Sequence, residues 1–451
     1  MEAQARQPPS PPAWPIVGHL PAFWADPIGT FLNAQRSLGD VVAFQLGPRR
    51  LTLISHPDDI KEVLQDRPWE FDKSRGQHSR RLLGKGLLTS PETLWRHQRR
   101  LMQPVFARGM LGSFVPKMAA CTREMFARWG QQDGVVDLLA EMQQLSLTVV
   151  GQVLFGVDLT GQAQSIGRAF GVALEYVSGQ VFRFFRLPDV IPTPRNVRYL
   201  LAMRELDRFV FGLIELRRRE PGDALLSRLL AVRDETTGAP MSDQQVRDEV
   251  LTMVLAGQET TAIALAWAFH VLSTRPDIES QVVAEVRSVV RGDEPTADEL
   301  ARMPTTRALF DEVLRLYPPA PIMARYARKD EVLRGMLLPA NSLVVMSPYV
   351  TQRHAGFWKD PDQFDLERFR EEEPAGRPRF AYFPFGGGPR QCIGNQFAIL
   401  EALTVLAMVL GRFRLTPHGD GSGRIAGRIT LRPSGGVPVR LSPRAGSDAT
   451  R

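Results

Sequence analysis

The sequence predicts a single domain that is mainly α-helical and contains small β-sheets. From about residue 92 to 320, and again over 395–411, the pattern is helical, with Gly or Pro between the segments. Runs typical of strands are short and lie toward the two ends of the chain. No internal repeat and no linker divides the 451 residues, so we expect one domain over 28–445, although chains of this length often form several.

The expected β-rich part comes from separate stretches of the chain. Residues 1–27 are rich in Pro and predict an extended leader. Two apolar, β-branched runs, 41–46 and 50–54, flank Gly47-Pro48 and predict a hairpin. Further strand-like runs surround Pro339 and lie near the C-terminus. We therefore place the β-rich part at about 28–70, 325–350 and 425–442.

A long helix is expected from Ser242 to about residue 275, a length of about 50 Å. Ser242 and Gln245 have the S-x-x-Q spacing of a capping box, and Pro276 ends the helix. The acidic pair 248–249 is expected to interact with the positive N-terminal end. A helix this long and this apolar is typical of the centre of a protein.

The middle of this helix, residues 256–261, departs from a good helix sequence in three ways. Gly257 costs about 1 kcal/mol relative to Ala. Thr260 and Thr261 can bond back to backbone carbonyls and bend the helix. Glu259 is charged in an apolar stretch. Together these features indicate a site, and a solvated kink without function is the alternative.

The two cysteines have different surroundings. Two cysteines are too few for a disulfide scaffold or a Cys-rich zinc module. Cys121 is expected to fill the core. Cys392 lies in the Gly-rich stretch 385–394, directly before a helix that begins at Asn395. The helix N-terminus and the nearby Arg390 are expected to lower the pKa of the Cys392 thiol and favour the metal-binding thiolate.

Charge and hydropathy exclude some functions. The net charge of +7 is spread along the chain without a block of like charges, so we expect no nucleic-acid partner. A basic face for an acidic protein stays open. The N-terminus has no apolar signal segment, and no uninterrupted apolar run reaches about 18 residues. We expect a cytoplasmic protein without a membrane span, and peripheral contact with a membrane stays open.

The stretch around Cys392 resembles a known family. Phe385, Gly388, Arg390, Cys392 and Gly394 match F-x-x-G-x-R-x-C-x-G, the haem-binding loop of the cytochromes P-450. The resemblance implies the single cytochrome P-450 fold around haem b, with the Cys392 thiolate as the ligand of the iron.

Other motifs extend this resemblance over nearly the whole chain. Glu312-Val-Leu-Arg315 is similar to the family's E-x-x-R, in which the i,i+3 spacing allows an ion pair. Arg368 is similar to the residue that completes this structural network, although Leu366 stands where many members have Pro. Residues 256–261 resemble the family's oxygen-activation turn.

The resemblance also implies the cofactor contacts. Arginines suit the haem propionates because the guanidinium holds a carboxylate with two bonds. Trp95 and Arg99 match a W-x-x-x-R motif, and Arg325 follows the Pro-rich segment 318–321 where a strand offers an Arg. The expected contacts are Trp95, Arg99, Ala256, Gly257, Arg325, Phe385, Gly386, Arg390 and Gly394.

The resemblance assigns oxygen chemistry to Glu259 and Thr260. Thr260 would donate a hydrogen bond where dioxygen binds, and Glu259 would move between solvent and site to supply protons. Gly257 and a kink would make room for dioxygen. We therefore expect a monooxygenase that inserts one oxygen atom into a C–H bond. A haem-binding sensor without turnover is the alternative from another class.

The substrate is expected to be hydrophobic. The apolar pocket would include Leu88, Phe182, Leu255, Ile322 and Met323. The segments 86–89 and 347–353 resemble bacterial members that hydroxylate the ring of carotenoids. A carotenoid or another terpenoid is therefore expected, with fatty-acid hydroxylation as the alternative.

The electrons are expected to come from separate proteins. No flavin or iron–sulfur domain follows the Cys392 loop, so we expect a ferredoxin and its NAD(P)H-dependent reductase. The segments 96–100 and 80–81 are rich in Arg and would contribute to a basic docking face. The protein itself is expected to be a monomer.

Overall fold

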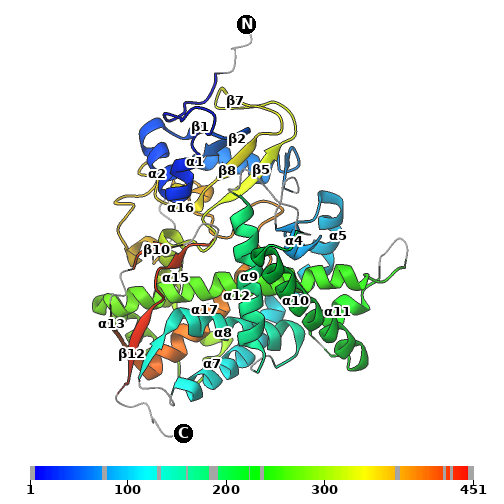
Figure 1. The fold of residues 1–451 in the computed structure, drawn as a ribbon. Coiled ribbons are helices and arrows are strands. Elements are labelled where there is room, and N and C mark those ends of the chain that lie inside the picture. Colours follow the sequence, from blue (N-terminus) through cyan, green and yellow to red (C-terminus); the bar gives the residue numbers. More distant parts are fainter. Residues whose placement is uncertain are drawn as a thin grey trace.

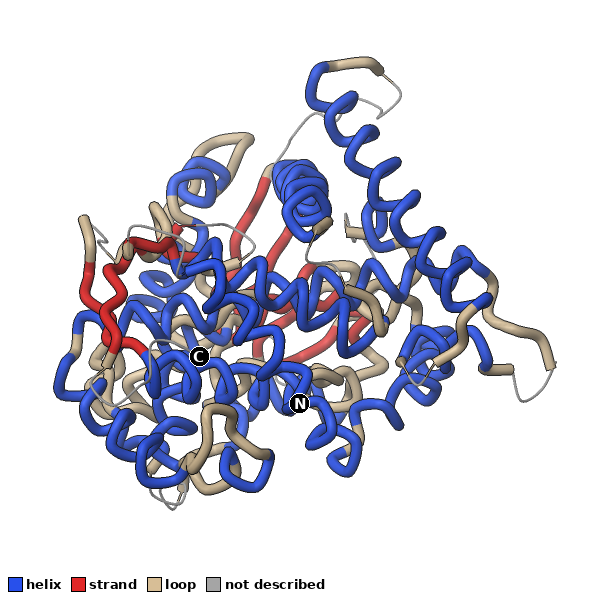
Figure 2. Tube along the Cα trace, turned by 90° about the horizontal axis from the view of Figure 1, so that it is seen from below, coloured by secondary structure: helices blue, strands red, loops and turns tan. Residues whose placement is uncertain are grey.

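The structure, a computed structural model, has a β-rich part and a larger helical part (Figure 1). It describes residues 6–73, 79–129, 134–158, 161–181, 191–222, 224–233, 238–370, 376–419, 423–426 and 430–444. In Figure 1 the large sheet lies near the N-terminus, and α12 crosses the helical part. Seen from below in Figure 2, the helices lie in front of the large sheet.

The large sheet has five strands in the order β1-β2-β8-β5-β3. Only the β2–β8 pair is parallel. The predicted hairpin is present, and Gly47 turns it with a φ of 58°. The strands are β1 Val41–Leu46, β2 Arg49–Ile54, β3 Phe71–Asp72, β5 Met323–Ala327 and β8 Leu343–Met346.

Three smaller sheets complete the β structure. One has the order β4-β12-β9, and the other two are the pairs β6–β7 and β10–β11. β4 lies inside the stretch expected to be helical, because β12 from the C-terminal end pairs with it. The strands are β4 Val135–Asp137, β6 Glu331–Leu333, β7 Met336–Leu338, β9 Phe413–Pro417, β10 Ile425–Ala426, β11 Arg432–Pro433 and β12 Pro438–Pro443.

The N-terminal segment differs from the extended leader expected over residues 1–27. Leu20–Ala25 forms a helix, α1, and Asp26 caps the next helix, α2 Pro27–Leu38. The preceding residues bond to the β-rich part, because Ala43 N donates to Pro9 O at 2.8 Å and Leu337 N donates to Arg6 O at 2.8 Å. The described leader is therefore part of the fold.

The helical part surrounds α12 Asp243–Thr274, which packs against α8, α10, α15 and α17. Its longer helices are α5 Glu92–Met102, α7 Val115–Trp129, α8 Leu138–Val149, α9 Ala163–Val181, α10 Pro194–Arg219, α13 Pro276–Val289, α15 Pro304–Leu316 and α17 Asn395–Arg412. The shorter helices are α3 Pro57–Lys61, α4 Arg80–Leu83, α6 Arg108–Leu111, α11 Leu225–Ala231, α14 Ala297–Leu300 and α16 Pro348–Thr351. Short π or 3₁₀ turns are η1 Glu62–Asp66, η2 Gln103–Phe106, η3 Gly112–Phe114, η4 Val150–Phe155, η5 Leu366–Phe369 and η6 Arg379–Ala381.

The start of α12 differs in one respect from the expected capping box. Ser242 accepts a hydrogen bond from Gln245 N at 3.2 Å, as predicted. The Gln245 side chain, however, donates to Lys85 O and Glu249 Oε1 at 3.2 and 3.1 Å. Gln245 therefore links α12 to the segment before α5.

Three helices of the described chain are long and apolar enough to cross a membrane by length and composition alone. They are Leu138–Phe155, Asp243–Thr274 and Asn395–Arg412. Between 67% and 78% of the most apolar window of each is buried inside the protein. Their apolar character is therefore accounted for by the core that they form together.

Candidate active site

The middle of α12 is accessible, although the helix lies in the centre of the protein. Val254 and Gln258 are buried, but Leu255, Ala256 and Gly257 between them are exposed or half-buried. Helix turns are buried on both sides of these residues. An accessible stretch in the centre of a buried helix indicates that a cavity lies beside it, which is where the sequence predicts a site.

Gly257 allows a close approach between α12 and η4. α12 is a continuous helix, and Thr260 Oγ1 donates to Ala256 O at 2.6 Å, which is the predicted back-bond. A Cβ atom at residue 257 would lie 2.8 Å from Val150 Cγ2. Glycine at this position therefore permits the close approach of η4. The expected role of Gly257 in making room for dioxygen stays a prediction.

The loop before α17 is folded by its glycines. Gly386 and Gly388 have φ values of 72° and 65°, which L side chains rarely adopt. A Cβ atom at Gly388 would overlap the backbone carbonyl of Leu64. Cys392 N donates to Phe385 O at 2.9 Å and closes the loop. This loop, residues 383–394, is named the Cys loop below.

Cys392 is accessible, yet protein surrounds it on most sides. Both observations hold if the thiol lies in the wall of a deep cavity. Burial raises the pKa of the Cys392 thiol, whereas Gly394 N–H and the charges of Arg99 and Lys73 lower it. The effect of burial is larger than the expected lowering of the Cys392 pKa. The cations that act on the thiol are Arg99 and Lys73, whereas the sequence suggested Arg390.

Cations gather near the Cys392 thiol. Burial, together with the charge of Arg390, lowers the pKa of Arg325 to about 10. Burial also lowers the pKa of Arg390 to about 10, while Asp72 acts in the opposite direction. Arg99 Nη1 donates to Gln391 O of the Cys loop at 2.8 Å. Positive charges crowded in this way, with Asp72 as a nearby carboxylate, favour an anionic ligand.

Arg390 shows where such a ligand would bind. Its guanidinium lies over the ring of Trp95, 4.8 Å from the ring centroid, and Nη2 donates to Ser90 O at 3.2 Å. Nη1 is buried and has no hydrogen-bond partner among the described residues. A carboxylate such as a haem propionate would satisfy it. The residues present therefore fit the haem that the resemblance implies.

Lys73 is a site residue that sequence reasoning missed. Burial lowers its pKa well below the ordinary value, and the charges of Arg325 and Arg390 lower it further. Lys73 follows β3, which pairs with β5, the strand of Arg325. No spacing in the sequence links residues 73 and 325, so the only signal is a lysine next to a short strand.

Glu259 and Thr260 point to different partners. Glu259 is 8% exposed, accepts from Thr430 Oγ1 at 3.2 Å and pairs with Arg432 Nη2 at 3.3 Å. Thr260 bonds within α12. Arg432 and Thr430 come from the C-terminal β-rich part, and sequence reasoning did not connect them with α12. The carboxylate is therefore held by β11 in this structure.

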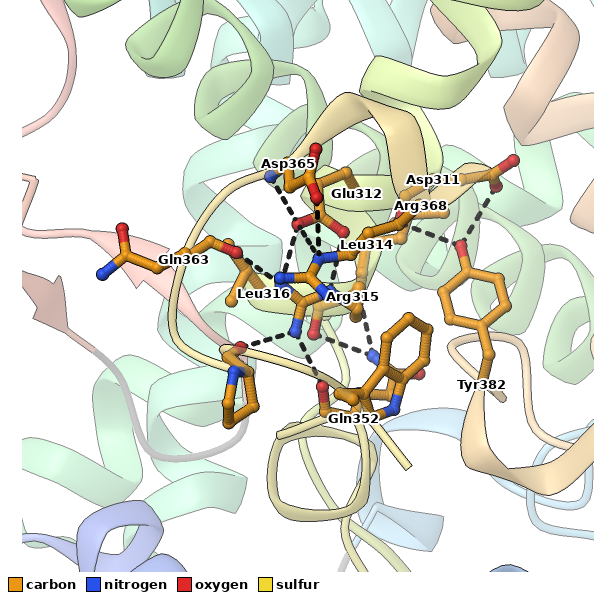
Figure 3. A network of polar contacts seen from close by, with 12 residues as sticks. Asp311, Glu312, Leu314, Arg315, Leu316, Gln352, Gln363, Asp365, Arg368 and Tyr382 are labelled. Carbon is orange, nitrogen blue, oxygen red and sulfur yellow. Dashed lines mark hydrogen bonds and ion pairs between the residues drawn. The ribbon is translucent and has the colours of Figure 1, made fainter. Parts of the chain in front are cut away.

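The predicted ion-pair network is present, and its Glu312–Arg315 pair is fully buried (Figure 3). Arg315 Nε and Nη2 lie 2.6 and 2.7 Å from the Glu312 carboxylate. Arg368 Nε lies 3.4 Å from Glu312 Oε1. Burial raises the pKa of Glu312, while Arg315 lowers it. α15 is thereby tied to η5, and Leu366 leaves Arg368 in place.

The network continues to the Cys loop through Gln352. Arg315 Nη1 donates to Gln352 O at 2.9 Å. The Gln352 side chain donates to Leu314 O at 2.9 Å and accepts from Phe383 N at 3.1 Å. The E-x-x-R motif therefore supports the loop that carries Cys392, through one intervening side chain.

Leu255, Ile322 and Met323 of the predicted pocket pack in three different apolar clusters. Leu255 is half-buried on α12, and Leu88 is 38% exposed. Ile322 and Met323 are half-buried, but Met323 packs with the cluster that includes Phe380 and Phe383, beneath the Cys loop. Phe182 lies outside the described residues. A pocket role for these residues stays a prediction.

Comparison with known proteins agrees with the geometry. The model of the family described as cytochrome P450 matches residues 8–437. Pentalenene oxygenase of Streptomyces avermitilis is 35% identical, covering 96% of this chain and 97% of that protein. Cyclooctatin synthase of Streptomyces melanosporofaciens is 34% identical, covering 96% and 95%. Cyclooctat-9-en-7-ol 5-monooxygenase of the same organism is 33% identical, covering 90% and 89%.

Proposed function

The chain belongs to the cytochrome P450 family, and we propose that it hydroxylates a cyclic terpenoid. The enzyme is a haem-dependent monooxygenase and therefore an oxidoreductase. The observation that carries the terpenoid proposal is the similarity over at least nine-tenths of the chain to proteins named for pentalenene, cyclooctatin and cyclooctat-9-en-7-ol. All three proteins are named for terpenoid compounds, and each is about a third identical to this chain.

The cofactor is haem with a cysteine thiolate ligand, and we assign Cys392 as that ligand. When bound, haem supplies the activation of dioxygen that oxidation of a C–H bond requires. Arg99, Arg325 and Arg390 are assigned to the propionates, together with Lys73, because these cations converge on the cavity. Trp95 supports Arg390 through its ring face.

Proton supply is assigned to Glu259 and Thr260. Glu259 is nearly buried but touches Arg432, whose side chain is 42% exposed, so the carboxylate lies one residue away from solvent. Thr260 lies on the next position of α12, beside the accessible Ala256. Exchange of the Thr260 hydroxyl from Ala256 O to the cavity would let it donate a proton there.

The substrate is held by apolar contacts. Leu255 and Ala256 form the accessible part of α12, and neither can hydrogen-bond a substrate through its side chain. A terpene hydrocarbon fits such a wall because it has no polar group to satisfy. The likeness of segments 86–89 and 347–353 to carotenoid ring hydroxylases makes carotenoids the second candidate class.

The electron donor is proposed to be a separate acidic ferredoxin. Arg100 is exposed on α5, the helix that also carries Trp95 and Arg99. Arg96 is exposed as well, but it pairs with Glu92 at 3.1 Å and lies over Trp69. Both arginines are therefore expected to contribute to a basic docking face.

A spectral titration with candidate substrates tests the terpenoid proposal. Cyclic terpenes, carotenoids and fatty acids are added separately to the haem-loaded enzyme, and the change of iron spin state is recorded. Terpenes should give saturable shifts and hydroxylated products when ferredoxin, reductase and NADPH are supplied. Shifts and products with fatty acids alone would overturn the terpenoid proposal. Shifts and products with carotenoids alone would instead identify carotenoids as the terpenoid class, and either result would leave the monooxygenase assignment intact.

A further inference from the structure

A three-residue segment near the C-terminus binds α12 at two places along the helix. Thr430 Oγ1 donates to Glu259 Oε1 at 3.2 Å, and Arg432 Nη2 lies 3.3 Å from the same oxygen. Leu431, between them, accepts a hydrogen bond at its carbonyl from Trp267 Nε1 at 2.7 Å. We name these three C-terminal residues the support segment, because they connect the candidate proton donor with a second residue of its own helix.

Trp267 lies about two turns beyond Glu259 on α12. Eight residues of α-helix separate the two positions by about 12 Å along the axis and by about 80° around it. Both positions therefore lie on one side of the helix, the side that β11 contacts. The bond between Trp267 and the support segment is made at a distance from Glu259, so any effect on the carboxylate must pass through that segment.

Trp267 is held firmly in its own place. The side chain is fully buried, and its ring is stacked on the ring of Tyr317, with 4.1 Å between centroids and 8° between planes. His270 meets the same ring edge-on, with 5.7 Å between centroids. The indole N–H is the single polar group of the side chain, and it is used for the bond to Leu431.

Leu431 is bound through both of its backbone polar groups. Its carbonyl accepts from Trp267, and its N–H donates to Pro319 O at 3.1 Å. Its side chain is fully buried. Pro319 follows Tyr317 by two residues, so the ring under Trp267 and the acceptor for Leu431 come from the same short stretch after α15. Leu431 is therefore the fixed point of the support segment.

The sheet that contains β11 contributes less to this position. The β10–β11 ladder has only two residue pairs, and one of them includes Pro433, which has no N–H to donate. A ladder this short gives little rigidity. Thr430 and Arg432 are themselves only half-buried. The two bonds of Leu431 therefore decide where its neighbours lie.

We propose that Trp267 is a positioning residue for proton supply, which keeps the support segment in reach of Glu259. The inference rests on the proposed function, because it takes Glu259 as the source of protons. Loss of the indole N–H would leave Leu431 O buried without this donor, and the backbone would have to move to satisfy it. Thr430 and Arg432 would move with it, and Glu259 would lose the two groups that hold it.

Carbodiimide labelling of Glu259 tests where the carboxylate is held. The holoenzyme is treated with a carbodiimide and glycine ethyl ester, and the labelled fraction of Glu259 is measured by peptide mass spectrometry. Trp267→Phe keeps a ring to stack on Tyr317 but has no N–H, and Glu259 should be labelled roughly three- to tenfold faster. If Trp267→Phe does not fold, the benzothiophene analogue of tryptophan at position 267, with sulfur in place of N–H, should give the same increase.

Trp358→Phe is the matched control for this measurement. Trp358 is also buried, and its Nε1 donates to the backbone carbonyl of Ala381 at 3.3 Å. Its ring lies under Arg315, on the side of the Cys loop, so the loss of this bond should leave the labelling of Glu259 unchanged. Unchanged labelling in the Trp267 variants, or an equal increase in Trp358→Phe, would overturn the proposal.

The solvent isotope effect on NADPH oxidation tests whether this position matters for proton supply. Ferredoxin and reductase are supplied, and pentalenene is the probe. Trp267→Phe should raise the isotope effect about twofold, because proton supply becomes slower. The double variant of Trp267→Phe with Glu259→Gln should behave like Glu259→Gln alone, and additive effects would overturn the positioning role.

Failure of the proposed function would give a different result. If Glu259→Gln itself left the isotope effect and the yield of product unchanged, Glu259 would not supply protons. The labelling experiment would still show whether Trp267 holds the carboxylate through the support segment, because it needs neither substrate nor turnover.

Discussion

The two sides of the candidate active site are held by different kinds of polar contact. Beneath the Cys loop, Arg315 is fully buried, and Nε, Nη1 and Nη2 all have hydrogen-bond partners within the protein. Along α12, Glu259 pairs with the half-exposed Arg432, and the pKa of Glu249 is raised to about 7. The hydrogen bonds of Arg315 are shielded from water, so they are costly to break. The contacts of Glu259 and Glu249 are easier to break, because water can reach the partner of Glu259 and because Glu249 can change its protonation state near neutral pH.

This difference separates a fixed side from an adjustable side. An ion pair that is fully buried is costly to break because one charge would stay unpaired in the interior. A pair that reaches solvent contributes little and exchanges readily. The fixed side suits the iron ligand, which needs a constant position. The adjustable side suits the substrate and the protons, which must enter the site. Substitutions on the fixed side should therefore disturb the protein more than substitutions on the adjustable side.

Replacement of Cys392 tests the fixed side at its centre. Cys392→Ser should abolish the absorption band of the reduced CO complex that gives the family its name, because serine does not supply the thiolate. Cys121→Ser is the matched control, since Cys121 is buried in α7 and its pKa is raised to about 12 by burial. A band that survives in Cys392→Ser would show that Cys392 is not the ligand.

Removal of Arg315 tests the network that supports the Cys loop. Arg315→Leu leaves the Glu312 carboxylate buried without its main partner and should lower the free energy of unfolding by about 3–5 kcal/mol. Urea unfolding and the amount of bound haem measure the effect. Arg96→Leu, on an exposed pair, should change stability by about 1 kcal/mol or less. Equal effects of the two variants would contradict a fixed side.

A buried carboxyl group on α17 gives the fixed side a pH dependence of its own. Ser146 Oγ donates to Glu401 Oε1 at 2.6 Å, and burial raises the pKa of Glu401 to about 8. Its contribution to stability is full at low pH and is lost as pH rises toward 8, by about 1.4 kcal/mol per pH unit at most.

The variant Glu401→Gln isolates this contribution. Compared with the wild type, it should show a flatter dependence of the unfolding free energy on pH between about 5 and 8.5. Urea unfolding at several pH values measures this dependence. Glu220→Gln, at an exposed position, should retain the wild-type slope. A wild-type slope in Glu401→Gln would mean that this glutamate is ionised in the fold.

The smallest effect on stability is expected at Arg432. Arg432→Met should change the free energy of unfolding by about 1 kcal/mol or less, because the pair with Glu259 reaches solvent. It should nevertheless change the fraction of NADPH oxidation that yields product and the pH profile of that fraction. Unchanged coupling, together with loss of coupling in Thr260→Ala, would exclude Arg432 and leave the proton role of Thr260 in place.

The sequence predicted the local elements well and their tertiary partners only where a motif linked them. The helix from Ser242, the hairpin at Gly47 and the helix from Asn395 were all identified from caps, turns and apolar patterns. The contact of Glu259 with Arg432 was not, because a separation of more than 170 residues leaves no periodic signal. The place of Lys73 in the site and the bonds of Asp248 and Glu249 to residues 85 and 87 were missed for the same reason.

The sequence by itself determined most of the chemistry of the site. The proposed iron ligand Cys392, the Glu312–Arg315 pair and the hydroxyl of Thr260 each lie in a short motif that can be recognised from local spacing. Only the tertiary structure decided the electrostatic balance. Burial raises the pKa of the Cys392 thiol, although the helix N-terminus acts to lower it. The folding of the chain also brings residues 85 and 87 to Asp248 and Glu249, which accept their backbone hydrogen bonds. The close approach of Val150 accounts for a glycine at residue 257. Desolvation and close packing depend on what surrounds a residue in space, and the order of residues along the chain does not contain that information.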